Sequence, residues 1–203
     1  PDNVNARLQL VQLLWNQKDY TSVIAQSKAA HAYNPEEMVF YYFGGMAHYQ
    51  KNDEDAALHE FRQGVAQVGA DASPDLVSDL YAVMGDILYK KKDKQAAYAA
   101  YDSCLQWKDD NVMALNNYAY YMSEEGIDLH KAESMSYKTV KAEPNNGTYL
   151  DTYAWILFKE ERYADAKTYI DAALKNSDST ENNSTILEHA GDIYAMNGTP
   201  KQI

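Results

Sequence analysis

The sequence has only one cysteine, Cys104, which excludes an internal disulfide, a CxxC redox pair and a cysteine-based zinc cluster. Helix breakers are also scarce, with 9 glycines and 5 prolines in 203 residues, and this favours a helical chain. Uncharged stretches such as residues 38–50 are much shorter than the ~20 residues that a membrane-spanning helix needs. We therefore expect no direct membrane insertion of this segment.

Positively charged residues are also few. The sequence has 18 Lys and Arg but 30 Asp and Glu, which gives a net charge of −12. A protein that holds phosphate groups needs cations, so the charge argues against nucleic acid and anionic membrane surfaces as partners. The nucleotide-binding, protease and dehydrogenase motifs GxxxxGK[ST], GxGxxG, GxSxG and HExxH are absent. We expect no enzymatic activity and no cofactor.

Small residues recur along the chain with a period close to 34 residues, and such a repeat determines the architecture. One column, with members 34 to 40 residues apart, comprises Val11, Gly45, Gly85, Ala119, Ala154 and Gly191. A second column, twelve or thirteen residues later, comprises Val23, Ala57, Ala97, Ala132 and Ala166. Helices that cross closely need small residues at the crossing. The columns, set within helical stripes of apolar residues, predict pairs of antiparallel helices.

Turn residues separate the two helices of each predicted pair, at Lys18-Asp19, Asn52-Asp53, Lys92-Asp93, Gly126 and Gly198. We interpret residues 52–55 as a solvated turn that caps the next helix, and not as a calcium loop. Pro35 and Pro144 fall where a second helix should stop. An inserted loop is predicted at residues 68–77, because Gly69, Ser73 and Pro74 interrupt the helical pattern. The loop is either padding, which we favour, or a functional lip.

Three units carry the most characteristic residues: Tyr41, Gly45, Ala57, Phe61 and Gly64; then Tyr81, Met84, Gly85, Leu88, Ala97 and Tyr101; then Leu150, Ala154, Leu157, Tyr163, Ala166 and Ala173. They resemble the tetratricopeptide repeat (TPR) family, from which the first unit departs most, with Val11 and Val23. The resemblance implies an all-α, right-handed solenoid of antiparallel helix pairs over residues 1–203. Its five full repeats and one half repeat would occupy approximately 4–37, 38–69, 78–111, 112–146, 147–180 and 184–203.

The segments 114–120, 149–157 and 188–194 also resemble the C-terminal part of long TPR proteins of Bacteroidetes, which are typically exported or lipid-anchored. This resemblance implies a bacterial periplasm or cell envelope. Pro1 stands at an end-of-unit position and the sixth unit lacks a second helix, so we expect a fragment of a longer array. The uncapped C-terminal face would need a cover, which predicts a weak homodimer.

In TPR arrays the first helices line a concave face, and the resemblance places these residues on it: Trp15, Tyr42, Tyr49, Asp79, Asp86, Tyr89, Asn116, Tyr120, Asp151, Trp155 and Phe158. About half of the aromatic rings are expected to fill gaps between neighbouring first helices. Rings supply contact area and amides supply hydrogen bonds, which together suit a peptide. The carboxylates favour a neutral to basic one. The Lys and Arg residues with which TPR co-chaperones hold acidic tails are missing.

We therefore predict a non-catalytic scaffold that binds a peptide or protein segment on the concave face. A structural spacer or self-assembly module of a longer envelope protein is the alternative. An enzyme or metal site built on Glu188, His189 and Asp192 is the least favoured reading, because a site needs convergent ligands with support. Cys104 is expected to be a small buried packing residue and not a nucleophile.

Overall fold

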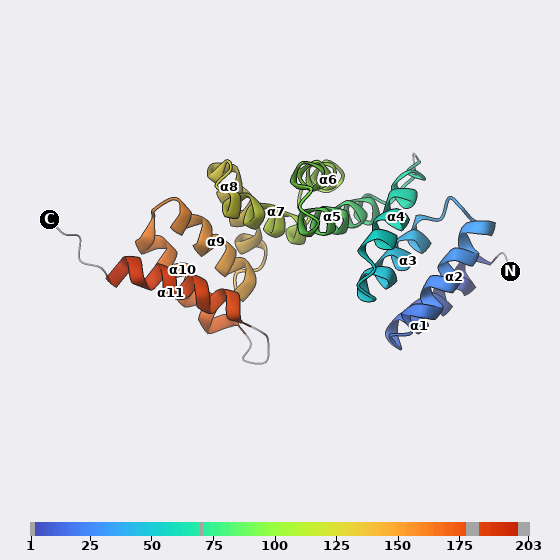
Figure 1. Cartoon of the computed structure of the whole chain (residues 1–203), viewed down its shortest axis with the longest axis horizontal. Coiled ribbons are helices and arrows are strands. Elements are labelled where there is room, and N and C mark those ends of the chain that lie inside the picture. The colour runs from blue at the N-terminus through green and yellow to red at the C-terminus, as the bar shows by residue number, and fades with distance from the viewer. Residues whose placement is uncertain (1–2, 70, 178–182, 199–203) are drawn as a thin grey trace. The chain divides into compact units, whose positions relative to one another are not determined.

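The computed structural model describes residues 3–69, 71–177 and 183–198, and every regular element in these ranges is an α-helix (Figure 1). The chain divides into two units, Pro1–Asp109 and Asp110–Ile203, and each is described by itself. None of the described helices is long and apolar enough to cross a bilayer. The predicted all-α helical-repeat fold is confirmed, whereas the single array over residues 1–203 stays a prediction.

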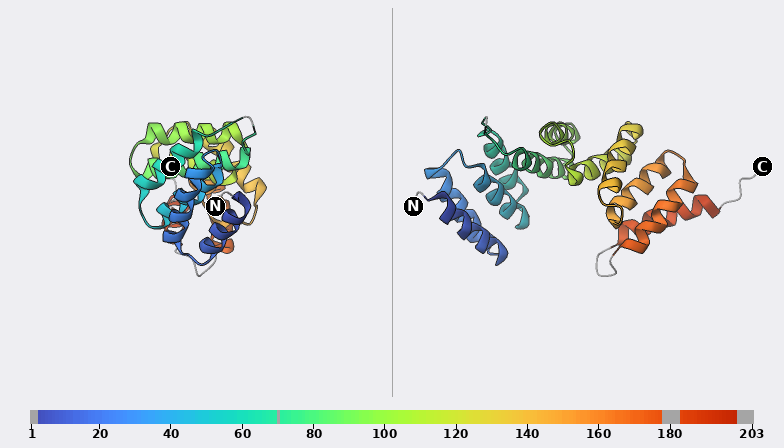
Figure 2. Two further views of the ribbon diagram at one scale, coloured as in Figure 1. Left: turned by 90° about the vertical axis from the view of Figure 1, so that its right-hand side faces the viewer. Right: turned by 180° about the vertical axis from the view of Figure 1, so that it is seen from behind.

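The first unit contains three helix pairs: α1 (Val4–Asn16) with α2 (Tyr20–Tyr33), α3 (Met38–Gln50) with α4 (Glu54–Val65), and α5 (Pro74–Lys90) with α6 (Lys94–Trp107). The blue helices α1 and α2 lie side by side in Figure 1 and again in Figure 2. One apolar cluster includes Val11, Val23 and Phe40, and another includes Phe61 and Leu80; all five are fully buried. Each cluster therefore contains residues of neighbouring pairs, as expected of stacked repeats.

The second unit contains α7 (Val112–Glu125), α8 (Leu129–Ala142), α9 (Gly147–Lys159), α10 (Tyr163–Asn176) and α11 (Ser184–Gly198). The orange and red helices α9, α10 and α11 pack together in both figures. Leu157, Ile170 and Ile193 supply fully buried side chains to their common core. Because α11 contacts both α9 and α10, it covers an apolar surface that the α9–α10 pair alone would expose.

The predicted turns at residues 18–19, 52–53, 92–93 and 126 are confirmed, and they share one backbone geometry. The turn predicted at Gly198 is not tested, because Gly198 ends α11 and the residues after it lie outside the described ranges. At the α5–α6 turn, Lys92 is left-handed with φ 67°, and the Asp93 N–H donates to the Leu88 carbonyl at 3.0 Å. This hydrogen bond closes a Schellman motif. The Asp93 side chain then caps α6 by accepting the Ala96 N–H at 3.2 Å. Equivalent left-handed residues end α1, α3, α7 and α9: Lys18, Asn52, Gly126 and Glu161.

The first small-residue column lies where paired helices cross, as predicted. A Cβ atom on Gly45 would lie 2.3 Å from the Phe61 ring, and one on Gly85 would lie 2.8 Å from the Tyr101 ring. Both distances are shorter than van der Waals contact, so only glycine allows these approaches. Gly191 in the same column meets no atom within 4 Å, which leaves its position unconstrained in the described residues.

The predicted loop at residues 68–77 is wrong at its C-terminal end. Helix α5 already begins at Pro74, so residues 74–77 form its first turn. The Ser73 hydroxyl caps the Leu76 N–H at 3.5 Å, and Pro74 occupies the first helical turn. Proline is well suited to this position because its missing N–H would have no helical partner there. The Ser-Pro sequence that resembled a loop is therefore a helix start.

Candidate functional site

The predicted inner-face residues all lie on α1, α3, α5, α7 and α9, the first helices of their pairs. In the first unit these side chains are half-buried. Trp15 makes edge contacts with Tyr20 and Phe43, at centroid distances of 5.3 and 5.8 Å. Tyr42 makes a similar contact with Phe43 at 5.8 Å. Part of each ring packs against its neighbours, and the other part is open to a ligand.

Two tyrosines of the first unit are held by neighbouring side chains. The Lys90 Nζ atom donates to the Tyr49 hydroxyl and lies 4.8 Å above the Tyr49 ring centre. This is a cation–π contact combined with a hydrogen bond. The Tyr89 ring centre lies 6.5 Å from that of Tyr98 on α6. These contacts keep the Tyr49 ring in place on α3 and the Tyr89 ring in place on α5.

The two predicted carboxylates of the first unit belong to different environments. Asp86 accepts a hydrogen bond from the hydroxyl of Tyr101, a fully buried residue of α6. Asp79 lies close enough to Tyr42 for its charge to add to the effect of burial, and both raise the pKa of the Tyr42 hydroxyl. Asp86 therefore has a structural partner, while Asp79 contributes negative potential beside a half-buried ring.

In the second unit three of the five predicted residues are more deeply buried, whereas Tyr120 and Phe158 are half-buried. Asn116, Asp151 and Trp155 are 5%, 5% and 7% exposed. The Trp155 ring stacks on His189 at 4.0 Å and on Phe158 at 4.9 Å, and its Nε1 atom donates to Glu124 at 2.7 Å. Trp155 is therefore one of the rings that fill the gap between neighbouring first helices.

His189 explains the burial of Asp151. Its Nδ1 atom lies 2.9 and 3.0 Å from the two carboxylate oxygens of Asp151, and both side chains are almost fully covered. The predicted trio of Glu188, His189 and Asp192 does not converge, because His189 faces α9 whereas Glu188 and Asp192 are exposed on α11. The sequence gives no signal for the Asp151–His189 pair, because the two residues are 38 positions apart and come together only through helix packing.

A pocket of about 300 Å³ is lined by residues of α7 and α9 and of the start of α11. It includes three of the predicted residues, and its lining is formed by Asn116, Asn117, Tyr120, Thr148, Asp151, Thr152, Asn183, Thr185 and Ile186. The lining combines an aromatic ring, amides, hydroxyls and one carboxylate. Such a surface can hydrogen-bond a peptide backbone in several ways.

Asn116 has an unused hydrogen-bond acceptor in this pocket. Its Nδ2 atom donates to Asn117 at 3.2 Å, but its buried Oδ1 atom has no partner among the described residues. A buried acceptor without a donor is costly, by about 1–3 kcal/mol. A ligand N–H that reached this oxygen would remove that cost.

Negatively charged side chains surround Tyr120. Burial, followed by the charges of Glu124, Asp151 and Glu188, raises the pKa of the Tyr120 hydroxyl to about 12. The hydroxyl therefore stays protonated at neutral pH and can donate a hydrogen bond.

Cys104 is fully buried in α6, as predicted for a packing residue. Its Sγ atom lies 3.1 Å from the Ser78 hydroxyl, and burial raises the pKa of the thiol to about 11. A thiol in this state is a poor nucleophile. Away from the inner face, the described residues contain one group with the side chains of a metal site, His130, Glu133 and Glu160.

A family profile described as "Tetratricopeptide repeat" matches residues 78–111, the range predicted for the third repeat. The "TPR repeat-containing protein PA4667" of Pseudomonas aeruginosa is 32% identical over 66 residues, which are 32% of this chain and 11% of that protein. The chain is similar to the tetratricopeptide repeat family over this one repeat. It thus matches only about a tenth of this curated relative.

Solved structures of TPR proteins share the fold. YrrB, described as "a TPR protein with an unusual peptide-binding site", gives a TM-score of 0.69 at 15% identity, over 92% of this chain and 91% of YrrB. PilW, described as a "widely conserved type IV pilus biogenesis factor", gives 0.70 at 17% identity, over 95% of this chain and 89% of PilW. At these identities the similarity extends to the fold alone.

Proposed function

We propose that the chain is a non-catalytic scaffold that binds an extended, neutral to basic peptide segment on its inner faces. Tetratricopeptide repeat proteins generally act as interaction scaffolds, and the similar protein YrrB is described as having a peptide-binding site. The observation that carries the proposal is the buried, unpartnered Oδ1 atom of Asn116 in a pocket lined by Tyr120 and Asp151. A peptide N–H would satisfy this acceptor.

The charges around the pocket define the ligand further. Glu124, Asp151 and Glu188 all act on Tyr120, so a Lys or Arg side chain next to the bound backbone would gain favourable energy. The first unit offers a separate aromatic surface, which includes Tyr42, Tyr49 and Tyr89 and could supply apolar contact area to a peptide of its own. An acidic segment would be repelled by the same carboxylates.

A displayed library of random peptides, panned against the purified chain, tests this proposal. We expect enrichment of sequences with Lys or Arg, and synthetic copies should bind less tightly as salt is added. Asn116→Ala should weaken binding about tenfold, whereas Asn16→Ala, at an exposed amide at the end of α1, should leave it unchanged. Enrichment of acidic peptides, or equal affinity of the two variants, would refute the proposed site.

A self-assembly module remains the second candidate, and exposed apolar side chains on α11 favour it. Leu187, Tyr194 and Met196 are 61%, 40% and 44% exposed. Leu187 and Tyr194 are seven residues apart and lie on the same side of α11, so a weak homodimer through that side would bury both. Sedimentation velocity over a hundredfold range of concentration tests the idea. Leu187→Lys should abolish any concentration-dependent increase in sedimentation coefficient, and a monomer at all concentrations would exclude self-assembly.

We also propose a bacterial cell-envelope location. Its support is the sequence resemblance to long, exported TPR proteins together with the fold that the chain shares with the pilus biogenesis factor PilW. Fractionation of the source cells, followed by detection with an antibody to this segment, tests it. Recovery in the cytosolic fraction alone would contradict the proposal.

A further inference from the structure

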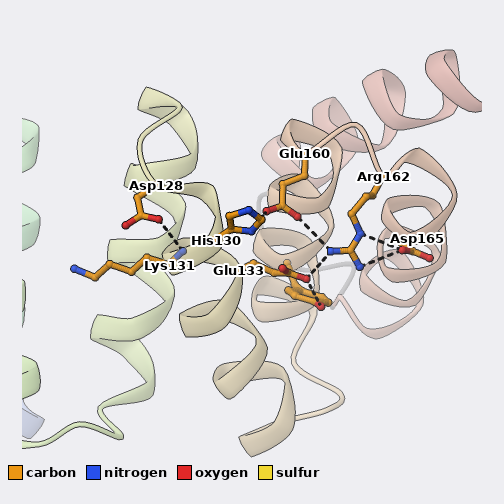
Figure 3. Close-up of polar contacts among 8 residues, drawn as sticks. Asp128, His130, Lys131, Glu133, Glu160, Arg162 and Asp165 are labelled. Atoms are coloured by element: carbon orange, nitrogen blue, oxygen red, sulfur yellow. Dashed lines mark hydrogen bonds and ion pairs between the residues drawn. The ribbon is translucent and has the colours of Figure 1, made fainter.

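Three side chains of metal-ligand type meet in the second unit, and none of them lines the proposed peptide pocket (Figure 3). His130 and Glu133 lie one helical turn apart on α8, so they project from the same side of that helix. Glu160 comes from the turn that follows α9. One ligand atom from each of the three residues lies within 4.8 Å of the other two.

Glu160 carries the second, independent observation. Its side chain is only 10% exposed, and its buried Oε1 atom has no hydrogen-bond partner in the described part of the chain. The His130 Nδ1 atom lies 3.5 Å from this oxygen. Two ligand atoms bound to the same tetrahedral zinc ion, at 2.0–2.1 Å each, are about 3.3 Å apart. The observed separation is therefore close to that of two zinc ligands.

Arg162 donates hydrogen bonds to one carboxylate oxygen of Glu133 and to one of Glu160. Its Nη1 atom donates to Glu133 Oε1 at 2.7 Å and to Glu160 Oε2 at 3.3 Å. Its Nε and Nη2 atoms donate to Asp165 at 3.2 and 3.1 Å. Tyr153 also donates to Glu133 Oε1, at 3.3 Å. Glu160 Oε1 and Glu133 Oε2 are thus the oxygens through which a cation would bind, and Arg162 would orient them.

The repeat pattern makes Arg162 unusual. The corresponding position in the first three pairs carries an aspartate that caps the following helix: Asp19, Asp53 and Asp93. Arg162 makes no side-chain cap to α10. The fifth pair therefore lacks a cap that typically contributes about 1 kcal/mol, and has instead a residue that fixes Glu133 and Glu160.

The group is also accessible and negatively charged. A pocket of about 290 Å³ beside it is lined by His130, Glu133, Ser134, Tyr137 and Tyr153. The His130 side chain is 95% exposed, so an ion can approach with part of its water shell. Three carboxylates surround one guanidinium, so a divalent cation would balance the excess negative charge.

We propose that His130, Glu133 and Glu160 form a zinc site with an open fourth position for water. One imidazole nitrogen and two carboxylate oxygens form a ligand set that zinc accepts, and an ion there would link α8 to the α9–α10 turn. This proposal is independent of the peptide site, because it shares no residue with it.

The test is calorimetric titration of the untagged chain, first stripped with a chelator, with zinc chloride. One zinc ion per chain is expected to bind, with a dissociation constant of about 10 μM or lower. His130→Ala and Glu160→Gln should each weaken binding at least about tenfold. His59→Ala removes another exposed histidine, on α4, and should change the affinity less than about twofold.

Cobalt(II) supplies a readout that depends on coordination geometry. The wild-type chain should show the strong visible absorption of a four-coordinate cobalt ion, and His130→Ala should abolish it. Because His130 is exposed, its replacement should leave the circular dichroism spectrum and melting temperature of the metal-free chain unchanged. Absence of saturable zinc binding below about 1 mM, or equal affinity in wild type and His130→Ala, would overturn the proposal.

Discussion

Inner-face positions of the repeat have different environments in the two units. In the first unit, Tyr42, Tyr49 and Tyr89 are half-buried and keep part of their rings accessible. In the second unit, Asp151 and Trp155 are covered by His189 of α11. The repeat therefore determines which side of a helix a residue occupies, whereas the neighbouring helix determines whether that residue is exposed. The predictions below test this difference.

The largest expected effect is on Trp155. Trp155→Ala should lower the free energy of unfolding by about 3–5 kcal/mol, because the ring packs between His189 and Phe158 and a cavity would remain. Tyr49→Ala should have a clearly smaller effect, since that ring is half-buried. Urea denaturation followed by circular dichroism measures both. Equal losses would show that the two units do not differ in this way.

The buried hydrogen bond between Asp151 and His189 should give the next largest effect. Asp151→Ala removes the partner of His189 and should cost about 3 kcal/mol, because a polar ring is left buried without its hydrogen bonds. Asp192→Ala is the matched control, since Asp192 is an exposed acid of α11, and it should change stability by less than about 0.5 kcal/mol. Similar values for the two variants would contradict the role given to Asp151.

Sequence periodicity predicted the helix pairs, the turns at Asp19, Asp53 and Asp93, and the burial of Cys104. These features depend on residues that are close in sequence or on the repeat itself. Residues 74–77 were misassigned because a Ser-Pro sequence can end a helix or begin one.

The candidate sites were harder to predict, because they depend on contacts between repeats. The Asp151–His189 pair joins α9 to α11, and the group around Arg162 joins α8 to the α9–α10 turn. Only the three-dimensional arrangement brings these residues together. The replacement of the capping aspartate by Arg162 was the one sequence signal that could have indicated an unusual fifth pair.

The small-residue column permits a comparison of the same repeat position in the two units. Gly45→Ala should cost about 1–3 kcal/mol, because the new Cβ atom would overlap the buried Phe61 ring. Gly191→Ala meets no atom within 4 Å and should instead stabilise α11 by up to about 1 kcal/mol through helix propensity. Chemical denaturation gives both values, and a loss of stability in Gly191→Ala would indicate that this face is covered in solution.

The smallest effect concerns the left-handed residue that ends a helix in each unit, Lys92 in the first and Gly126 in the second. Lys92 has a φ of 67°, a region that glycine adopts without a Cβ clash, so Lys92→Gly should raise the free energy of unfolding by about 0.5–1 kcal/mol. Gly126→Ala should lower it by a similar amount, because its φ is 65° while no atom lies near the added Cβ. Asn52→Gly is the control, since asparagine tolerates this geometry and should gain less. All three substitutions are at exposed turn positions. If the m-value is unchanged, the shift of the denaturation midpoint therefore measures the backbone effect directly. If Lys92→Gly instead lowers stability, the gain in conformational entropy of the unfolded chain outweighs the relief of backbone strain. The turns at Lys92 and Gly126 would then not be equivalent.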